Sequence, residues 1–281
     1  MARITTFRVG HCTHPSCMAL KGSGLASRCF PSRAYLIDTS AGLYLWDTGY
    51  ADHFRTATAQ GVFRLYPWLT PVSFEPHESL CGQLRNHGVR PDDIDTLILS
   101  HFHADHIAGM RDFPQARLLC AARGWEAVRR LSGVGAVRQG FVPGLLPPDI
   151  EARLEFVERS PNSALPVSLA PFTVARDITG TGELLVVDLP GHVEGHLGAF
   201  VAGDSGWTLL ASDAAWLADG YQLLRGPSEL SFLIQHNRRE YYDTLRRVHE
   251  LYASGGATIR LTHESVDDFE PTPVSAIGVP T

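Results

Sequence analysis

Short apolar segments that read as β-strands recur along the whole chain, with helical patterns between them. In the first half, apolar and polar residues alternate over 3–9, and apolar runs occupy 34–37, 43–46 and 96–99. Both patterns are typical of strands. Residues 79–87 show helical spacing instead. Strands mixed with helices predict an α/β fold in which helices cover the sheets.

The second half repeats this pattern and adds a longer helix. We expect that helix over 228–253, interrupted near Asn237, with glycines after it to end it. Its apolar stripe at helical spacing consists of Leu230, Leu233, Ile234, Tyr241, Leu245, Val248 and Tyr252. Four apolar runs predict further strands, at 184–189, 199–201, 208–211 and 258–261.

The composition is that of an ordinary globular chain. Of the 281 residues, 44% are apolar and 19% are charged, with 24 Lys+Arg against 30 Asp+Glu and a net charge of −6. No apolar run approaches the ~18 residues that a membrane helix needs, and no basic cluster favours nucleic acid. The first residues lack the apolar stretch of a secretory signal. We therefore expect one domain over 1–281, located in the cytoplasm, that binds neither nucleic acid nor membrane.

Thirteen histidines are the unusual feature of the composition, and three of them fall in one motif. His101-Phe102-His103-Ala104-Asp105-His106 follows directly after the predicted strand at 96–99. In an extended segment residues i and i+2 point the same way, so His101 and His103 can reach one metal ion. Asp105 and His106 come where the chain turns toward a helix, and they can face a second ion. Imidazole and carboxylate ligands suit zinc, iron, manganese or cobalt.

Three more potential ligands, His192, Asp213 and His263, come directly after other predicted strands. Taken singly, each has an ordinary interpretation as a surface histidine, a turn residue or a helix cap. Together with the motif they make a set of five histidines and two aspartates, in which the Asp213 carboxylate can bridge two cations. Two metal ions ~3.5–4 Å apart can hold a hydroxide between them, so the pattern predicts a dinuclear metal hydrolase.

These motifs resemble the metallo-β-lactamase superfamily, and within it the N-acyl-homoserine lactonase group most of all. The resemblance covers nearly the whole chain. It implies a four-layer αβ/βα sandwich, with two mixed β-sheets face to face, helices outside and the metal ions at one edge. Besides the residues already named, it rests on the segments Val9-Gly10-His11-Cys12, Tyr35-Leu36-Ile37-Asp38-Thr39, Asp47-Thr48-Gly49 and Pro190-Gly191-His192-Val193-Glu194-Gly195-His196.

The resemblance also implies a role for each site residue, with zinc as the expected metal. Asp47 is expected to hold a metal-bound imidazole, since the second N–H of such a ring needs an acceptor. His196 is expected to be a structural histidine behind the site. The implied ligands are His101, His103 and His192 on the first divalent ion, Asp105, His106 and His263 on the second, and Asp213 on both.

One position departs from the lactonases. Three residues after the bridging aspartate they carry a tyrosine that helps to stabilise the ester oxygen, whereas this chain has Trp216 there. An indole N–H can donate a hydrogen bond but cannot titrate like a phenol. Trp216 is therefore a candidate catalytic residue beside Asp213 and Asp105, of which Asp105 can pass a proton to the leaving group. Tyr221 could replace the tyrosine in space, although a packed aromatic is its more ordinary interpretation.

The expected reaction is attack of a metal-bridging hydroxide on a lactone or ester that has an apolar portion. Because of Trp216, a phosphotriester or phosphodiester hydrolase stays open as an alternative, as does a thioesterase. A non-catalytic, metal-containing sensor or ligand-binding protein is the alternative from another class. β-Lactam hydrolysis is disfavoured, because true β-lactamases have a cysteine where this chain has Asp213.

Two apolar segments and the cysteines have no place in this chemistry. Residues 62–74 are rich in aromatics and can wall a substrate pocket, pack across a homodimer interface or belong to the core; the same holds for 141–148. Cys12, Cys17 and Cys29 are irregularly spaced, which favours ordinary thiols over an additional metal site.

Overall fold

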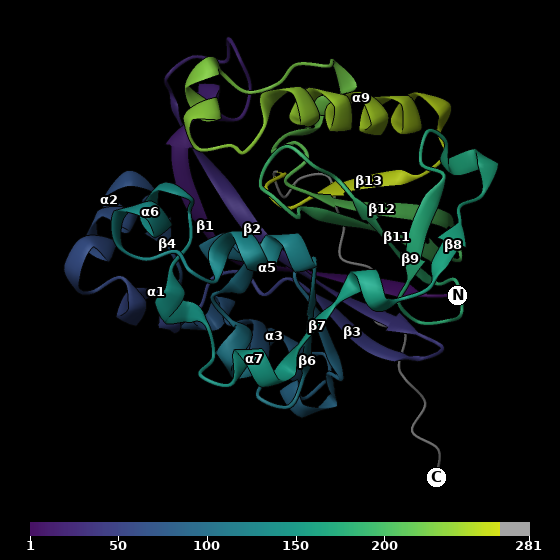
Figure 1. Ribbon diagram of the computed structural model, residues 1–281, viewed down its shortest axis with the longest axis horizontal. Coiled ribbons are helices and arrows are strands. Elements are labelled where there is room, and N and C mark those ends of the chain that lie inside the picture. Colours follow the sequence, from purple (N-terminus) through teal and green to yellow (C-terminus); the bar gives the residue numbers. More distant parts are fainter. Residues whose placement is uncertain (265–281) are drawn as a thin grey trace.

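Two β-sheets form the centre of the protein in the computed structural model, which describes residues 1–264 apart from the side chain of Leu233 (Figure 1). The first sheet is antiparallel from β4 to β3 and parallel from β3 to β7, so it is mixed. In spatial order its strands are β4 (Val72–Ser73), β1 (Arg3–Pro15), β2 (Ser27–Thr39), β3 (Gly42–Trp46), β5 (Thr96–Ile98), β6 (Arg117–Cys120) and β7 (Leu154–Phe156).

The second sheet is also mixed, because one parallel pair, β13 with β12, lies beside antiparallel neighbours. In spatial order its strands are β13 (Thr258–Leu261), β12 (Gly206–Ser212), β11 (Leu197–Gly203), β10 (Leu184–Asp188), β9 (Val174–Asp177) and β8 (Asn162–Ala164).

The sheets pack face to face, and the alternation of side chains along each strand explains why. Tyr35 and Ile37 of β2 lie in the core between the sheets, where they share a cluster with Val186 and Leu210 of the second sheet. The intervening Leu36 belongs to a separate core on the outer face. Because a strand presents successive residues to opposite faces, the consecutive apolar residues 34–37 of β2 require cover on both sides.

Helices supply that cover and make the outer two layers (Figure 1). The outer core of the first sheet includes side chains from α1, α3, α4, α5, α6 and α7, and the outer core of the second sheet includes side chains from α8 and α9. The four-layer sandwich expected from the resemblance is therefore confirmed. The helices are α1 (Asp52–Ala57), α2 (Tyr66–Leu69), α3 (Leu80–Asn86), α4 (Ala104–Ile107), α5 (Ala122–Val128), α6 (Gly133–Arg138), α7 (Ile150–Arg153), α8 (Ala218–Gln222) and α9 (Arg238–Ser254).

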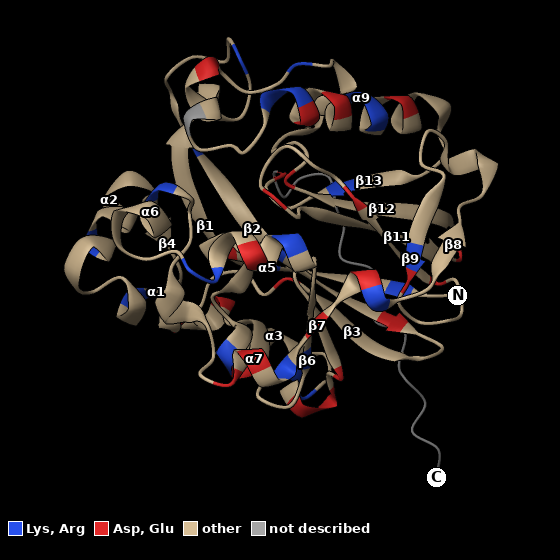
Figure 2. Cartoon of the chain, in the orientation of Figure 1, with Lys and Arg blue, Asp and Glu red and all other residues tan. Residues whose placement is uncertain are grey.

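The long C-terminal helix begins later than its apolar pattern predicted. Asn237 accepts hydrogen bonds from the backbone of the first turn and so starts α9, while Glu229–Leu233 form a separate 3₁₀ turn. Leu230 lies in that turn and Ile234 directly after it, outside α9, and both side chains are exposed. Their assignment to the apolar stripe of the helix was therefore wrong. The stripe from Tyr241 onward is buried except for the half-exposed Tyr252, and charges of both signs cover the outer face (Figure 2).

The aromatic segment 62–74 divides between core and surface. Tyr66 is buried, and Phe63 and Phe74 pack against the core of the first sheet. Leu65, Trp68 and Leu69 are exposed. In the second apolar segment the side chains of Phe141, Val142 and Leu145 belong to the core.

All five cysteines are free thiols, as the sequence indicated, and they differ in exposure. Cys29 is exposed and Cys17 is half-buried. Burial raises the pKa of the other three thiols, in the case of Cys81 to about 12. These buried cysteines are Cys12, Cys81 and Cys120.

Within 1–264, none of the helices has the length and apolar character needed to cross a bilayer.

Candidate metal centre and active site

The predicted ligands converge where strands of both sheets end. The chain leaves β5 at Ile98 and reaches His101 and His103 in extended conformation, with His103 directly preceding α4. Asp105 and His106 then lie in the single turn of α4, and the ring centroid of His106 is 3.9 Å from that of His101. The spacing of the motif on a strand-to-helix junction thus distributes its four side chains over two neighbouring positions.

His192 reaches the same place on a loop that docks against the start of α9. Gly191 has φ +125°, and a Cβ there would lie 2.1 Å from the backbone nitrogen of Tyr241, so only glycine permits this approach. The backbone nitrogen of His236 donates to the carbonyl oxygen of His192 at 2.9 Å, and Asn237 donates to that of Gly191 at 3.0 Å. The α9 start therefore fixes the position of His192.

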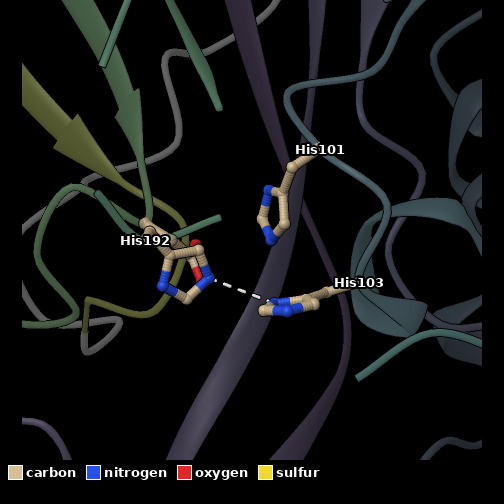
Figure 3. Close-up of side chains that lie close together, drawn as sticks. His101, His103 and His192 are labelled. Atoms are coloured by element: carbon tan, nitrogen blue, oxygen red, sulfur yellow. Dashed lines mark hydrogen bonds and ion pairs between the residues drawn. The ribbon is translucent and has the colours of Figure 1, made fainter. Parts of the chain in front are cut away.

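One group of donors consists of His101, His103, His192 and Asp213, each offering one atom within 4.8 Å of the others. The three imidazoles point toward one another (Figure 3). His192 Nε2 lies 3.1 Å from His103 Nδ1 and 3.4 Å from Asp213 Oδ2. The side chains of His101, His192 and Asp213 are buried, and that of His103 is half-buried.

A second group consists of Asp105, His106 and His263, all buried. Asp105 Oδ2 lies 3.5 Å from His263 Nε2 and 3.7 Å from His106 Nε2. The Asp213 carboxylate joins this group to the first, because His263 Nε2 is 3.1 Å from its Oδ2 and His106 Nε2 is 3.4 Å from its Oδ1. Asp213 therefore faces both groups, as a bridging ligand must.

These spacings fit divalent metal ions. Ligand atoms 2.0–2.2 Å from a tetrahedral ion are about 3.3–3.6 Å from one another, close to the separations within each group. Moreover, His101 Nε2, His106 Nε2 and Asp213 Oδ1 are buried and make no hydrogen bond within residues 1–264. A buried polar atom without a partner is costly, and a bound cation would satisfy all three.

The outer nitrogens of several imidazoles are held by protein atoms. His106 Nδ1 lies 2.8 Å from Asp47 Oδ2, the contact expected for Asp47. His263 Nδ1 lies 2.8 Å from the carbonyl oxygen of Pro31. Gly140, with φ +62°, packs against the His103 ring so closely that a Cβ at this position would lie 2.7 Å from the ring. Such contacts orient an imidazole toward a metal ion.

Both ring nitrogens of His196 are occupied by protein atoms. Nδ1 lies 2.7 Å from the carbonyl oxygen of Leu189, and Nε2 accepts from the backbone nitrogen of Asp213 at 3.2 Å. His196 therefore positions the Asp213 backbone, in agreement with the structural role expected of it.

Burial and charge divide the histidines into two classes. Burial lowers the pKa of His101 and His192 strongly, and that of His103 to about 4, so these rings are neutral and can bind metal directly. Burial also acts on His106 and His263, but their neighbouring carboxylates, above all Asp47 for His106 and Asp213 for His263, outweigh it and raise both pKa values.

Trp216 lies against the Asp213 carboxylate. Its indole Nε1 donates to Asp213 Oδ2 at 3.1 Å, and its ring centroid lies 4.8 Å from that of His263. Tyr221 does not take the place of the missing tyrosine. It packs in the core between the second sheet and α9, with its ring centroid 5.4 Å from that of Tyr252.

Sequence reasoning missed Ser100. Its backbone nitrogen donates to Asp47 Oδ1 at 2.8 Å and its hydroxyl to Asp47 Oδ2 at 2.7 Å, while the same hydroxyl lies 3.0 Å from His101 Nδ1. It thereby links Asp47 to the motif histidines. The available signal was a small polar residue between a buried strand and the first histidine.

A hollow of about 530 Å³ adjoins the site. Its lining contains Val193, the residue after His192, and His236, whose backbone binds the His192 carbonyl. Arg138, Gln139 and Gln235 make much of the rest polar.

Known proteins share both the sequence pattern and the architecture. Residues 27–253 match the sequence profile of the metallo-beta-lactamase superfamily. A probable metallo-hydrolase of Mycobacterium tuberculosis is 28% identical over 261 residues, covering 85% of this chain and 74% of that protein. An N-acyl homoserine lactonase of Agrobacterium fabrum is 28% identical over 246 residues, which cover 83% of this chain and 79% of that protein.

Solved structures agree on the fold. AiiA of B. thuringiensis, solved with N-decanoyl-L-homoserine at its active site, superposes with a TM-score of 0.70 at 16% identity, covering 93% of this chain and 92% of that one. AidC, a dizinc lactonase, gives a TM-score of 0.65 at 15% identity, with coverages of 99% and 92%. The matched profile, the homologues and the donor cluster agree: this chain belongs to the metallo-beta-lactamase superfamily and is a metal-dependent hydrolase.

Proposed function

We propose that the protein hydrolyses lactones or esters with an apolar portion at a dinuclear site, with two zinc ions as the expected cofactors. The observation that carries the proposal is the convergence of seven donors into two groups that share Asp213. The relatives named N-acyl homoserine lactonases support the choice of a lactone or ester. An intact donor set disfavours a sensor, which would need no shared carboxylate.

His101, His103 and His192 would hold one ion and Asp105, His106 and His263 the other, with Asp213 contacting both. When bound, the ions would polarise the carbonyl group and lower the pKa of water. Hydrolysis breaks the acyl C–O bond, adds the oxygen of water to carbon and moves a proton from that water to the leaving oxygen.

We assign the transfer of that proton to Asp105. Its Oδ2 faces His106 and His263, whereas its Oδ1 has no hydrogen bond within the described part of the chain. In the proposed mechanism Oδ1 accepts the proton released by the attacking water and returns it to the leaving oxygen. Trp216, through its bond to Asp213 Oδ2, keeps the shared carboxylate in one orientation.

A substrate panel with measured zinc content tests this function. Zinc-loaded protein should turn over lactones and alkyl esters, and Asp213→Ala should lose both activity and most of its zinc. Full activity of Asp213→Ala with bound zinc would contradict the shared role of Asp213. Zinc-loaded wild-type protein that hydrolyses neither lactones nor esters, yet still binds them, would favour the sensor.

Phosphotriester hydrolysis is the second candidate, and Trp216 is the observation that favours it. The indole N–H is engaged by Asp213 rather than free for the ester oxygen, so this position offers no dedicated donor to a carbonyl substrate. Phosphotriesters and thioesters therefore belong in the same panel. A higher kcat/KM for a phosphotriester than for any lactone would decide for the second candidate.

We keep a homodimer as part of the proposal. Leu65, Trp68 and Leu69 are exposed on the aromatic segment, and exposed apolar side chains of this size are typical of interfaces. Analytical ultracentrifugation of wild type and Trp68→Glu should show a dimer that the variant weakens.

A further inference from the structure

His14 is a half-buried histidine whose ring has no hydrogen bond within the described residues, although it lies beside the site. It stands on β1 two residues after Cys12, so both side chains project from the same face of the strand. Its ring centroid lies 5.9 Å from that of Trp216, which in turn contacts Asp213 and His263. His14 thus ends a line of rings that starts at the metal donors.

The electrostatic surroundings of His14 place it close to the second donor group, that of Asp105, His106 and His263. Burial lowers its pKa, the charge of His263 lowers it further, and Asp105 acts in the opposite direction. A histidine with a lowered pKa is neutral at pH 7, with one N–H donor and one acceptor nitrogen. Neither nitrogen is hydrogen-bonded by another group in the described part of the chain.

A lactonase or esterase needs a donor where negative charge develops on the leaving oxygen. Neither Trp216 nor Tyr221 offers such a donor. The Trp216 indole N–H donates to Asp213, and the Tyr221 ring packs against Tyr252 in the core. His14 stands beside Trp216 with an uncommitted N–H.

We propose that His14 is a further catalytic residue, which donates a hydrogen bond to the leaving oxygen of the substrate. This inference rests on the proposed carbonyl hydrolase and narrows its substrates to lactones and alkyl esters. Their leaving oxygens are strongly basic and need a donor, unlike the oxygen of a nitrophenyl ester.

The test compares His14→Phe, which keeps a ring without N–H, with His14→Gln, which keeps a donor. As control, His77→Phe changes an exposed histidine on a 3₁₀ turn. His14→Phe should lose about 10- to 100-fold in lactone kcat/KM, the size of one hydrogen bond to a charged oxygen. With 4-nitrophenyl acetate it should lose less than about threefold, and zinc content should stay unchanged.

Equal losses on both substrates, or none on the lactone, would overturn the role of His14. So would a His14→Gln variant no better than His14→Phe.

A binding measurement separates this inference from the proposed function. 4-Hydroxybutyrate carries the former leaving oxygen of γ-butyrolactone, and butyrate lacks it. Calorimetry on zinc-loaded protein should show that wild type prefers 4-hydroxybutyrate and that His14→Phe has lost the preference. If the wild type hydrolyses no ester at all, the proposed function fails. The binding preference for 4-hydroxybutyrate over butyrate then still tests whether His14 donates to this oxygen: its loss in His14→Phe supports the donor, and its persistence overturns it.

Discussion

Replacing Asp47 by asparagine removes one charge from the groups that hold the metal donors and leaves the shape of the site unchanged. Asp47 is fully buried at the end of β3 with φ 57°, a left-handed conformation that asparagine tolerates well. In the variant the amide oxygen can still accept from the backbone nitrogen of Ser100. The new NH₂ group, however, replaces the Oδ2 atom that now faces both the Ser100 hydroxyl and His106 Nδ1.

Two magnitudes give the expected loss of zinc-binding free energy. A hydrogen bond to a charged group contributes about 1.5–3 kcal/mol, and one such bond, between His106 and Asp47, is lost. Loss of a group that orients a metal-binding histidine typically weakens metal binding about 10- to 100-fold, or ~1.4–2.7 kcal/mol. The two figures agree. We therefore expect Asp47→Asn to bind the more weakly held of the two zinc ions about 10- to 100-fold less tightly than wild type does.

Competition with a chromophoric chelator at pH 7.5 measures this affinity directly. The matched control is Asp38→Asn, which removes an exposed carboxylate paired with Arg3 at 2.7 Å and should leave zinc binding unchanged. Circular dichroism of the metal-free proteins shows whether each variant is folded. A folded Asp47→Asn protein with wild-type affinity for both zinc ions would refute the role assigned to Asp47.

Other measurements test the remaining features of the site and the thiols. Trp216→Phe keeps a ring but loses the bond to Asp213 Oδ2, so calorimetry should show zinc binding weakened about 3- to 10-fold; unchanged affinity would contradict that bond. The raised pKa values of His106 and His263 favour the protonated rings in the metal-free protein, and any proton on these rings must leave when zinc binds. Calorimetry in buffers of different ionisation enthalpy should therefore show that zinc binding releases protons, with apparent affinity rising from pH 6 to 8; pH-independent binding would contradict this. Ellman's reagent should modify Cys29 rapidly in the native protein and the three buried cysteines only after unfolding, whereas rapid modification of all five would show that the buried thiols are accessible.

Periodicity located the strands that carry the site because those strands are buried on both faces. The apolar run that forms β5 ends one residue before Ser100, and the run that forms β13 ends just before Thr262 and His263. By contrast, the sequence pattern did not identify β6 to β9, which are three or four residues long. β5 and β13 are equally short, but β6, β7 and β9 each include a charged residue, as does β13, and β8 is mostly polar, so none of these four stands out as an apolar run.

The arrangement of the two sheets could be predicted only through the resemblance, since no local pattern determines which strands pair. The parallel pairing of β3 with β5 sets Trp46 opposite Ile98. That register brings Asp47 beside Ser100, although 53 residues separate them along the chain. Contacts between the metal motif and its supporting groups are therefore tertiary, which is why Asp47 was expected by analogy and Ser100 was missed.

The proposed donor for the leaving oxygen also depends on tertiary contacts, so the sequence alone could not identify it. The resemblance pointed to Trp216, because the lactonases carry a tyrosine at that position, three residues after the aspartate that corresponds to Asp213. Whether its N–H faces substrate or carboxylate depends on the tertiary position of the ring, and the ring is held by Phe30 and His263 with its N–H on Asp213. His14 reaches Trp216 from a strand about 200 residues earlier, placed there because β1 pairs with β2 and sets His14 opposite Arg28. A slip of one residue in that pairing would turn His14 away from the site and Thr13 toward it, so the proposed donor depends on strand register.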